Sequence, residues 1–242
     1  MDQQAISGKK HHNVSHRPPS GKKWLKQIFA GQMGLTVMAI FYGMSVGIPL
    51  DSLTSDWDAT SKKAMPRVHQ NMKEEDPYLT VITHPCGPWG NWGNFNIARG
   101  GQAEATVLEL RESQRPLLKL VNRIIVGRVK ACRHVFVEQP YGSESINEPE
   151  ITDVRKLIEA GRLLMIKVDG CQLGYKDRES QLPHKTSVYI TSMLAAESVF
   201  ADTVCSCPQH EPLEGNNKFG SRTKQAAEWP PLLNQKVIEC ML

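Results

Sequence analysis

The feature that most constrains the fold is an alternation of short apolar runs with longer segments of helical periodicity. The apolar runs predict strands at residues 27–30, 45–50, 78–83, 134–138, 163–168 and 186–191. The periodic segments predict helices at residues 33–43, 60–74, 104–131, 150–160 and 223–241. Alternation of this kind is typical of βαβ units with a parallel sheet. The sequence therefore predicts an α/β fold with one doubly wound, mainly parallel sheet.

Glycine and proline predict where several of these helices begin or end. Gly43 and Gly161 follow the first and fourth helical patterns, where a C-terminal glycine is favoured. Pro66 lies inside the second pattern, so that helix is expected to be kinked or to begin late.

The positive charge of the chain is concentrated at its N-terminus. Residues 1–23 hold five basic residues and one acidic residue, which accounts for the whole formal charge of +4. This stretch has no apolar periodicity, so we expect a disordered basic tail at 1–23 followed by a single domain at 24–242. A nucleic-acid partner would meet this tail and not a basic body. The alternative is a solvated leader without a partner.

The apolar content points to an intracellular protein without a membrane span. No apolar run approaches the ~20 residues that a membrane-spanning helix needs, and the N-terminus lacks the apolar stretch of a signal peptide. In a reducing compartment cysteines are expected to be free thiols. They are Cys86, Cys132, Cys171, Cys205, Cys207 and Cys240.

Polar motifs follow the predicted strands, where ligands bind in a doubly wound sheet. After the first strand, "FAGQMG" (29–34) places Gly31 and Gly34 in a turn that can approach a ligand closely. Asp51 ends the second strand, twenty residues after Gly31, the usual spacing for a carboxylate that binds a ribose. Asp58 is a further acceptor. The alternative is an ordinary tight turn and a turn-capping aspartate.

The segment "THPCGPWGNWGNFN" (83–96) follows the third predicted strand. Pro85 and Pro88 restrict the backbone around Cys86, and a thiol on a rigid loop at this edge is a candidate nucleophile. Trp89 and Trp92 are expected to stack on a nucleic-acid base or to cover the site. A structural, buried cysteine is the alternative.

Glu138 ends the fourth predicted strand, so it is expected at the same edge as Cys86. A half-buried carboxyl group there could stay protonated and donate a hydrogen bond, and the alternative is a loop cap. Cys205, Cys207 and His210 resemble half of a metal site. No second pair lies at zinc spacing nearby, so no metal is predicted.

Taken in order, these motifs resemble those of the DNA (cytosine-5)-methyltransferases, and more closely the divergent methyltransferase-like domains of retroelement-type polyproteins. The matching segments extend over roughly residues 27 to 240. They are "FAGQMG" (29–34), "PLD" (49–51), Trp57-Asp58, "HPC" (84–86), "EQP" (138–140), "DGCQLG" (169–174), "HKTS" (184–187) and "CPQHEPLEG" (207–215).

The resemblance implies a Rossmann-like fold of the S-adenosylmethionine-dependent methyltransferase type and a mechanism. The thiol of Cys86 would add to C6 of a cytosine, Glu138 would donate a hydrogen bond at N3, and Lys185 would replace arginines that orient catalytic groups. The target base would have to leave its duplex to reach the thiol. S-adenosylmethionine would be bound by Phe29, Gly31, Gly34, Asp51, Asp58 and Pro85.

The chain departs from the family pattern at several positions of this site. Met33 occupies the position of a glycine in the cofactor turn of the family. His84 occupies the position of the first proline in Pro-Pro-Cys, and Gln139 that of the asparagine after the glutamate. Three hypotheses therefore stay open. The chain is a methyltransferase acting on a nucleic-acid base, or an inactive module of a mobile element that binds nucleic acid or protein, or an α/β enzyme with another ligand.

Overall fold

The computed structural model of the protein describes residues 22–52, 55, 57–176, 185–213 and 215–242. The predicted basic tail, residues 1–23, lies outside the described residues except for its last two.

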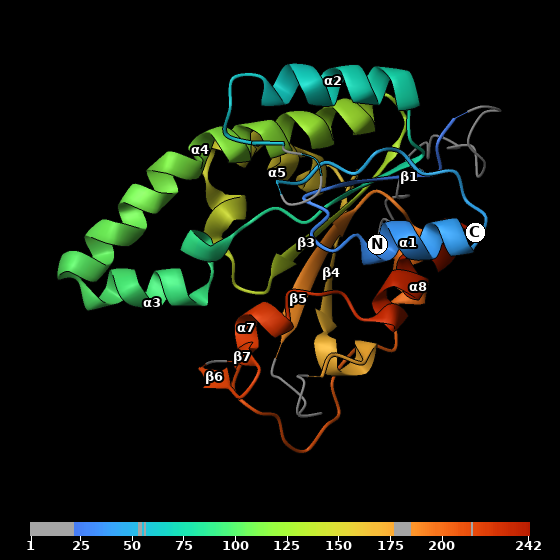
Figure 1. Cartoon of the computed structure of the whole chain (residues 1–242). Helices are drawn as coiled ribbons and strands as arrows, with labels where there is room; N and C mark the ends of the chain where they lie inside the picture. The colour runs from blue at the N-terminus through green and yellow to red at the C-terminus, as the bar shows by residue number, and fades with distance from the viewer. Residues whose placement is uncertain (1–21, 53–54, 56, 177–184, 214) are drawn as a thin grey trace, which may run out of the picture.

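The centre of the molecule is a five-stranded sheet with the order β1-β2-β3-β5-β4 (Figure 1). Its strands are β1 (Leu25–Ile28), β2 (Leu79–Ile82), β3 (His134–Pro140), β4 (Leu164–Asp169) and β5 (Thr186–Thr191). β1, β2 and β3 are parallel, and β5 runs antiparallel to both of its neighbours, β3 and β4. Five of the six predicted strands are thereby confirmed.

The sixth predicted strand, residues 45–50, is only a pair of isolated parallel bridges beside β1. Leu25 pairs with Val46, and Ile28 pairs with Leu50. From β1 the chain passes outward to this segment and then returns across β1 to form β2 on its other side. The strand order therefore reverses between β1 and β2, which is where a doubly wound fold binds its ligands. The predicted Rossmann-like fold is confirmed by this topology.

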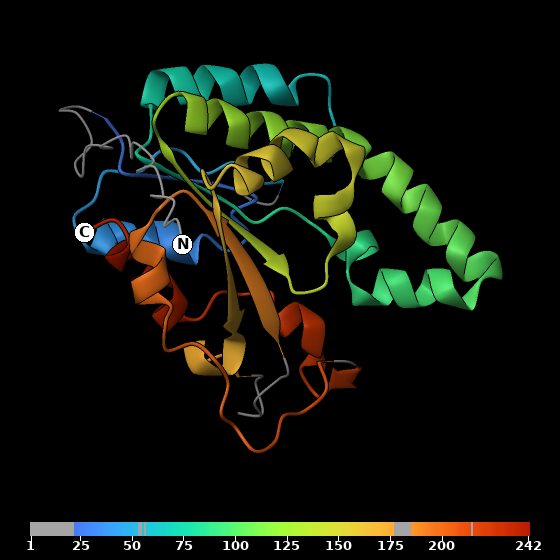
Figure 2. The ribbon, with the colours of Figure 1, turned by 180° about the vertical axis from the view of Figure 1, so that it is seen from behind.

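Helices cover both faces of the sheet (Figure 2). One face carries α2, α4 and α5, and the other carries α1, α6 and α8. The bounds are α1 (Gly34–Phe41), α2 (Ala64–Glu75), α3 (Asn91–Arg99), α4 (Gly101–Lys130), α5 (Thr152–Glu159), α6 (Ala195–Val199), α7 (Arg222–Gln225) and α8 (Pro231–Glu239). A two-stranded ribbon, β6 (Asn216–Asn217) and β7 (Gly220–Ser221), precedes α7. None of the helices in the described residues is long and apolar enough to cross a membrane.

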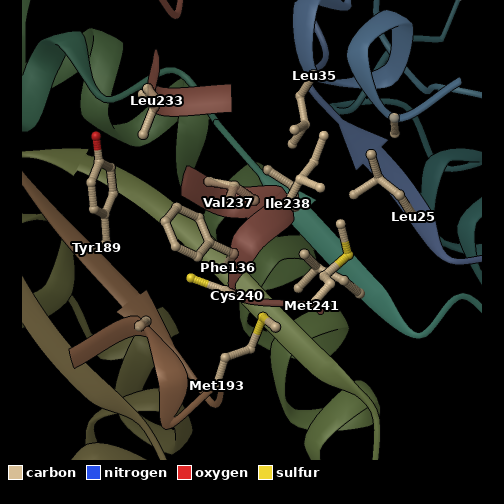
Figure 3. Close-up of a cluster of buried hydrophobic side chains, with 14 of the residues drawn as sticks. Leu25, Leu35, Phe136, Tyr189, Met193, Leu233, Val237, Ile238, Cys240 and Met241 are labelled. Carbon is tan, nitrogen blue, oxygen red and sulfur yellow. The ribbon is translucent and has the colours of Figure 1, made fainter. Parts of the chain in front are cut away.

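Two apolar clusters, one on each face, hold the layers together. Figure 3 shows the first, in which Phe136 and Tyr189 of the sheet belong to one cluster with Val237 and Ile238 of α8, and Phe136 lies next to Val237. The second lies under α2, α4 and α5 and includes Val135 of β3. Neighbouring strand residues point to opposite faces, so β3 contributes Phe136 to one cluster and Val135 to the other.

Glycines end helices where the sequence predicted it, but α3 and α6 were missed. The single helix predicted at 223–241 is divided into α7 and α8, because Pro230 and Pro231 interrupt it. Gly43 and Gly161 have φ angles of 72° and 66°. α2 begins late, with Pro66 in its first turn, where a proline is tolerated. The tryptophan segment was predicted to be a loop, but residues 91–99 form α3. No proline follows Pro88 before residue 116, so nothing in the chain prevents this helix.

A buried ion pair attaches the outer segment to β1. Lys26 is fully buried, and its Nζ lies 2.7 Å from the Glu75 carboxylate and donates to the carbonyl of Ile48 at 2.7 Å. The other Glu75 oxygen accepts the Ile48 N–H at 3.0 Å. Burial lowers the pKa of Lys26, and the Glu75 carboxylate opposes that shift. This pair fixes the start of the segment that carries Asp51.

Candidate active site at the carboxyl edge of the sheet

The turn after β1 has an unusual backbone. Phe29, Gly31 and Met33 all have positive φ angles, of 62°, 51° and 59°. Glycine adopts this conformation freely, whereas a methionine or phenylalanine is strained in it by about 1 kcal/mol. Asp51 Oδ2 accepts the Gly31 N–H at 3.0 Å, so the two sequence motifs predicted to act together are in contact.

A cavity of about 100 Å³ lies beside this turn, at the reversal of strand order. Its walls include Phe29, Gly31 and Gly34, three of the residues predicted to bind the cofactor, together with Glu138. Residues from the C-terminal region, Ala227, Trp229 and Asn234, form another wall.

The other three residues predicted to bind the cofactor do not line this cavity. Asp51 is buried behind the turn. Asp58 is exposed, and its carboxylate accepts hydrogen bonds from the N–H and hydroxyl of Thr60 at 2.8 and 2.7 Å. Pro85 is exposed on the loop after β2. Asp58 therefore caps a local turn, and its predicted role as a further acceptor for the cofactor is not supported by its position.

Two of the three residues predicted to be catalytic, Glu138 and Lys185, lie side by side, and the third, Cys86, lies in the loop that follows β2 at the same edge of the sheet. Lys185 Nζ lies 3.7 Å from Glu138 Oε1, which also accepts the Ser187 hydroxyl at 2.8 Å. Both charged groups act electrostatically on Cys86. Glu138 lies within β3 and not at its end. Lys185 reaches the same edge because β5 is antiparallel, so that its first residue is level with the last residues of β3 and β4.

The thiol of Cys86 is strongly disfavoured as an anion. Its pKa is raised from 9.0 to about 12, mainly by burial and next by the charge of Glu138, while Lys185 acts in the opposite direction. The thiol is therefore almost entirely protonated at neutral pH. A reaction at this sulfur needs a nearby group that accepts its proton.

Two departures from the family pattern, His84 and Gln139, are in contact with each other. His84 Nε2 lies 3.3 Å from Gln139 Nε2, and Gln139 Oε1 accepts the Ser145 hydroxyl at 2.7 Å. Burial lowers the pKa of His84 from 6.5 to about 4, so the imidazole is neutral at pH 7. Within the described residues its Nδ1 has no hydrogen-bond partner. These two residues and Ser145 thus form one buried polar network, in the segments that carry Cys86 and Glu138.

The two tryptophans of this segment differ in exposure. Trp89 is fully buried, and its Nε1 donates to Glu148 at 2.9 Å, so the prediction that it offers its ring to a base is wrong. The ring is buried because Trp89 lies in a 3-10 turn that packs under α4. Trp92 is 53% exposed on α3 and stands edge-on to Phe95, with ring centroids 5.7 Å apart.

The glycine-turn cavity has groups that a cofactor could contact, but it is smaller than a nucleoside ligand such as S-adenosylmethionine requires. An added Cβ at Gly31 would meet no atom within 4 Å, so the turn is open to a ligand. Asn234 Oδ1 is buried on the cavity wall without a partner among the described residues, and it could accept a hydrogen bond from a ligand. However, small-molecule pockets usually measure about 300–1,000 Å³. A nucleoside ligand would therefore need a wider cavity than this one.

Sequence reasoning missed a second cluster at the same end of the sheet. Cys171 joins Cys205, Cys207 and His210, and one ligand atom of each lies within 4.8 Å of the others. Cys171 follows β4 in a short 3-10 helix, η4 (Gly170–Leu173). The signal was weak because Cys171 and Cys205 are separated by 34 residues, far from any local zinc spacing.

Comparisons with known proteins give structural neighbours only. No protein-family model matches the sequence, and no curated protein is significantly similar to it. The S. pombe Dnmt2 methyltransferase aligns with 78% of this chain and 57% of its own, at 9% identity and a TM-score of 0.42. The Entamoeba histolytica methyltransferase EhMeth aligns with 71% of this chain and 53% of its own, at 9% identity and a TM-score of 0.38. The chain thus spans little more than half of either protein, and its fold assignment rests on the topology described above.

Proposed function

We propose that the chain is a methyltransferase-like domain that acts on C5 of a cytosine in nucleic acid. The observation that carries this proposal is the gathering of Cys86, Glu138 and Lys185 at the carboxyl edge of the sheet, beside the glycine turn. The resemblance of the motif order supplies the reaction, and the geometry supplies a role for each group.

The reaction begins with proton transfer from Cys86. The thiol proton passes to the carboxylate of Glu138, and the sulfur then forms a bond to C6 of the cytosine. Glu138, now protonated, donates to N3, where negative charge develops as C5 becomes nucleophilic. Lys185 lies 3.7 Å from the carboxylate and holds it in place.

S-adenosylmethionine, when bound at the glycine turn, would supply the methyl group that C5 accepts. Solvent water would then accept the C5 proton as the C6–S bond breaks, and the Cys86 thiolate would recover its proton from Glu138, which restores the aromatic ring. The base must be extruded from a duplex or presented on a single strand, because a stacked base cannot reach a half-buried thiol.

Isothermal calorimetry with S-adenosylmethionine and with its demethylated product tests the cofactor. We expect binding to the wild-type chain, and tighter binding to Trp229→Ala, since this substitution removes part of the wall that restricts the cavity. Trp92→Ala is the matched control, because Trp92 is exposed and does not line the cavity. No detectable heat at millimolar ligand with either wild type or Trp229→Ala would refute the proposed function.

Transfer of a labelled methyl group to cytosine-containing RNA and DNA tests the mechanism. Cys86→Ser is expected to abolish incorporation, whereas Cys132→Ser, at an exposed cysteine outside the site, should leave it unchanged. Undiminished transfer by Cys86→Ser would exclude the covalent route.

A second candidate function is an inactive binding module of a mobile element, suggested by the resemblance to retroelement-type domains. The small cavity and the high pKa of Cys86 favour it. Nucleic acid would then be held by the basic tail and by the exposed Trp92, whose ring can stack on a base. Gel-shift titration tests this idea: deletion of residues 1–23 and Trp92→Ala should each weaken binding, and unchanged affinity in both would refute it.

A further inference from the structure

We propose that Cys171, Cys205, Cys207 and His210 form a structural zinc site. The four proposed ligands belong neither to the glycine turn nor to the group of Cys86, Glu138 and Lys185, so the metal site can be tested apart from methyl transfer. All four residues are half-buried, and they line one cavity of about 260 Å³. This cavity lies where β4 ends and β5 begins.

The distances match a tetrahedral metal site. Zinc binds thiolate sulfur at about 2.3 Å and imidazole nitrogen at about 2.0–2.1 Å, so neighbouring ligand atoms lie about 3.5–3.8 Å apart. Cys205 Sγ lies 3.4 Å from His210 Nε2, and all four ligand atoms lie within 4.8 Å of one another. Three cysteines and one histidine are one of the common ligand sets of structural zinc, and four protein ligands leave no open position for a substrate.

Surrounding groups stabilise the negative charge that three thiolates and one zinc ion would carry. Gln172 Nε2 lies 3.7 Å from Cys171 Sγ and 3.6 Å from Cys207 Sγ. The Cys207 N–H donates to Cys205 Sγ at 3.2 Å. The ammonium-bearing residues Lys167 and Lys185 line the same cavity. Hydrogen bonds and cations of this kind are what a thiolate-rich metal site requires around its ligands.

The site would join two distant segments of the chain. Cys171 lies in η4, directly after β4, whereas the other three ligands lie in the loop after α6, which passes the lower end of β4 in Figures 1 and 2. Asp169 reinforces the connection, since its carboxylate accepts the Cys205 N–H at 2.9 Å and the Thr186 hydroxyl at 2.7 Å. Thr186 follows Lys185, so the metal would fix the end of β5 that carries the candidate catalytic lysine.

The metal content of the full chain tests the proposal. The protein is expressed in zinc-supplemented medium, purified without chelators and analysed for zinc, iron and copper by mass spectrometry. We expect about one zinc per chain in the wild type and under about 0.1 in Cys171→Ser and Cys205→Ser. His210→Ala should also lose zinc. Cys132→Ser is the matched control for the cysteine variants, and His69→Ala, at an exposed histidine, is the control for His210→Ala. Both controls should keep their zinc.

Spectroscopy of the wild type keeps the test decisive if a variant fails to fold. X-ray absorption at the zinc edge should show three sulfur ligands and one nitrogen ligand. A reduced wild-type chain that takes up no zinc on titration would overturn the proposal. So would stoichiometric iron or copper in place of zinc, or zinc that persists when Cys171 and Cys205 are both replaced.

Discussion

Two thiol sites lie at the same end of the sheet, and the groups around their sulfur atoms differ. Cys86 is a single half-buried thiol, and burial together with the charge of Glu138 raises its pKa to about 12. The cysteine cluster combines three thiols and an imidazole with nearby lysines and hydrogen-bond donors. The comparison teaches that the neighbours of a cysteine, and not its exposure alone, decide its chemistry. Both kinds of site have half-buried sulfurs, but Cys86 is a single thiol near a carboxylate, whereas the cluster places three thiols and an imidazole within reach of one cation.

Chelation should separate the two sites with the largest effect. Removal of zinc by a strong chelator is expected to lower the free energy of unfolding by about 4 kcal/mol, because the metal binds the folded chain and not the unfolded one. This loss corresponds to a fall in Tm of about 8–16 °C. Thermal unfolding followed by circular dichroism measures this change. Cys86→Ser should show the same fall. An unchanged Tm in both proteins would contradict the metal-based half of the comparison.

Acid should act on the Cys86 site through His84. Its folded-state pKa of about 4 lies below the ordinary value of 6.5, so the unfolded chain binds the proton more readily and stability falls as the pH drops from 6.5 to 4. The imidazole accounts for a loss of about 3 kcal/mol over this range. Urea unfolding at several pH values measures the free energy of unfolding of wild type and of His84→Asn. Subtracting one from the other removes the acid effects on other groups, which both proteins share.

The control for this prediction is His69→Asn, at an exposed histidine, which should follow the wild-type profile. Equal pH dependence in wild type and His84→Asn would show that the buried imidazole is not the titrating group.

The charge beside Cys86 should set its rate of alkylation. The Glu138 carboxylate raises the pKa of Cys86, so Glu138→Gln is expected to increase the thiolate fraction and speed modification by iodoacetamide about tenfold at pH 8. Lys185→Met should slow it, because the ammonium lowers that pKa. Peptide mass spectrometry measures the rate at Cys86, with Cys132 in the same sample as reference. Equal rates in both variants would mean that neither charge reaches the sulfur.

The smallest effect on stability is expected from Trp92→Ala. The ring is 53% exposed, so its removal should change the free energy of unfolding by less than about 0.5 kcal/mol. Nucleic-acid affinity should fall several-fold if the ring stacks on a base. Urea unfolding and gel-shift titration on the same samples distinguish a contact with nucleic acid from a structural role. A loss of several kcal/mol would show that Trp92 belongs to the core.

The order of motifs made much of the fold and part of the site predictable. Apolar runs located the five strands because a buried strand must be apolar along its length. The expectation that Gly31, Cys86 and Glu138 share one edge follows from parallel strands, and the structure places them there. The helix at 91–99 and the burial of Trp89 escaped prediction, because a glycine- and asparagine-rich segment carries a weak helical signal and local sequence does not report packing.

By itself, the sequence determined the α/β class, the positions of five strands and the placement of the glycine turn and of Glu138 at the carboxyl edge, since these depend on periodicity and on short-range turn chemistry. Tertiary structure alone decided that Lys185 lies beside Glu138 and that Cys171 joins the cysteines of a distant loop. The physical reason is that β5 enters the sheet antiparallel between β3 and β4. Strand direction and pairing bring these side chains together, and both depend on contacts between residues far apart in the chain.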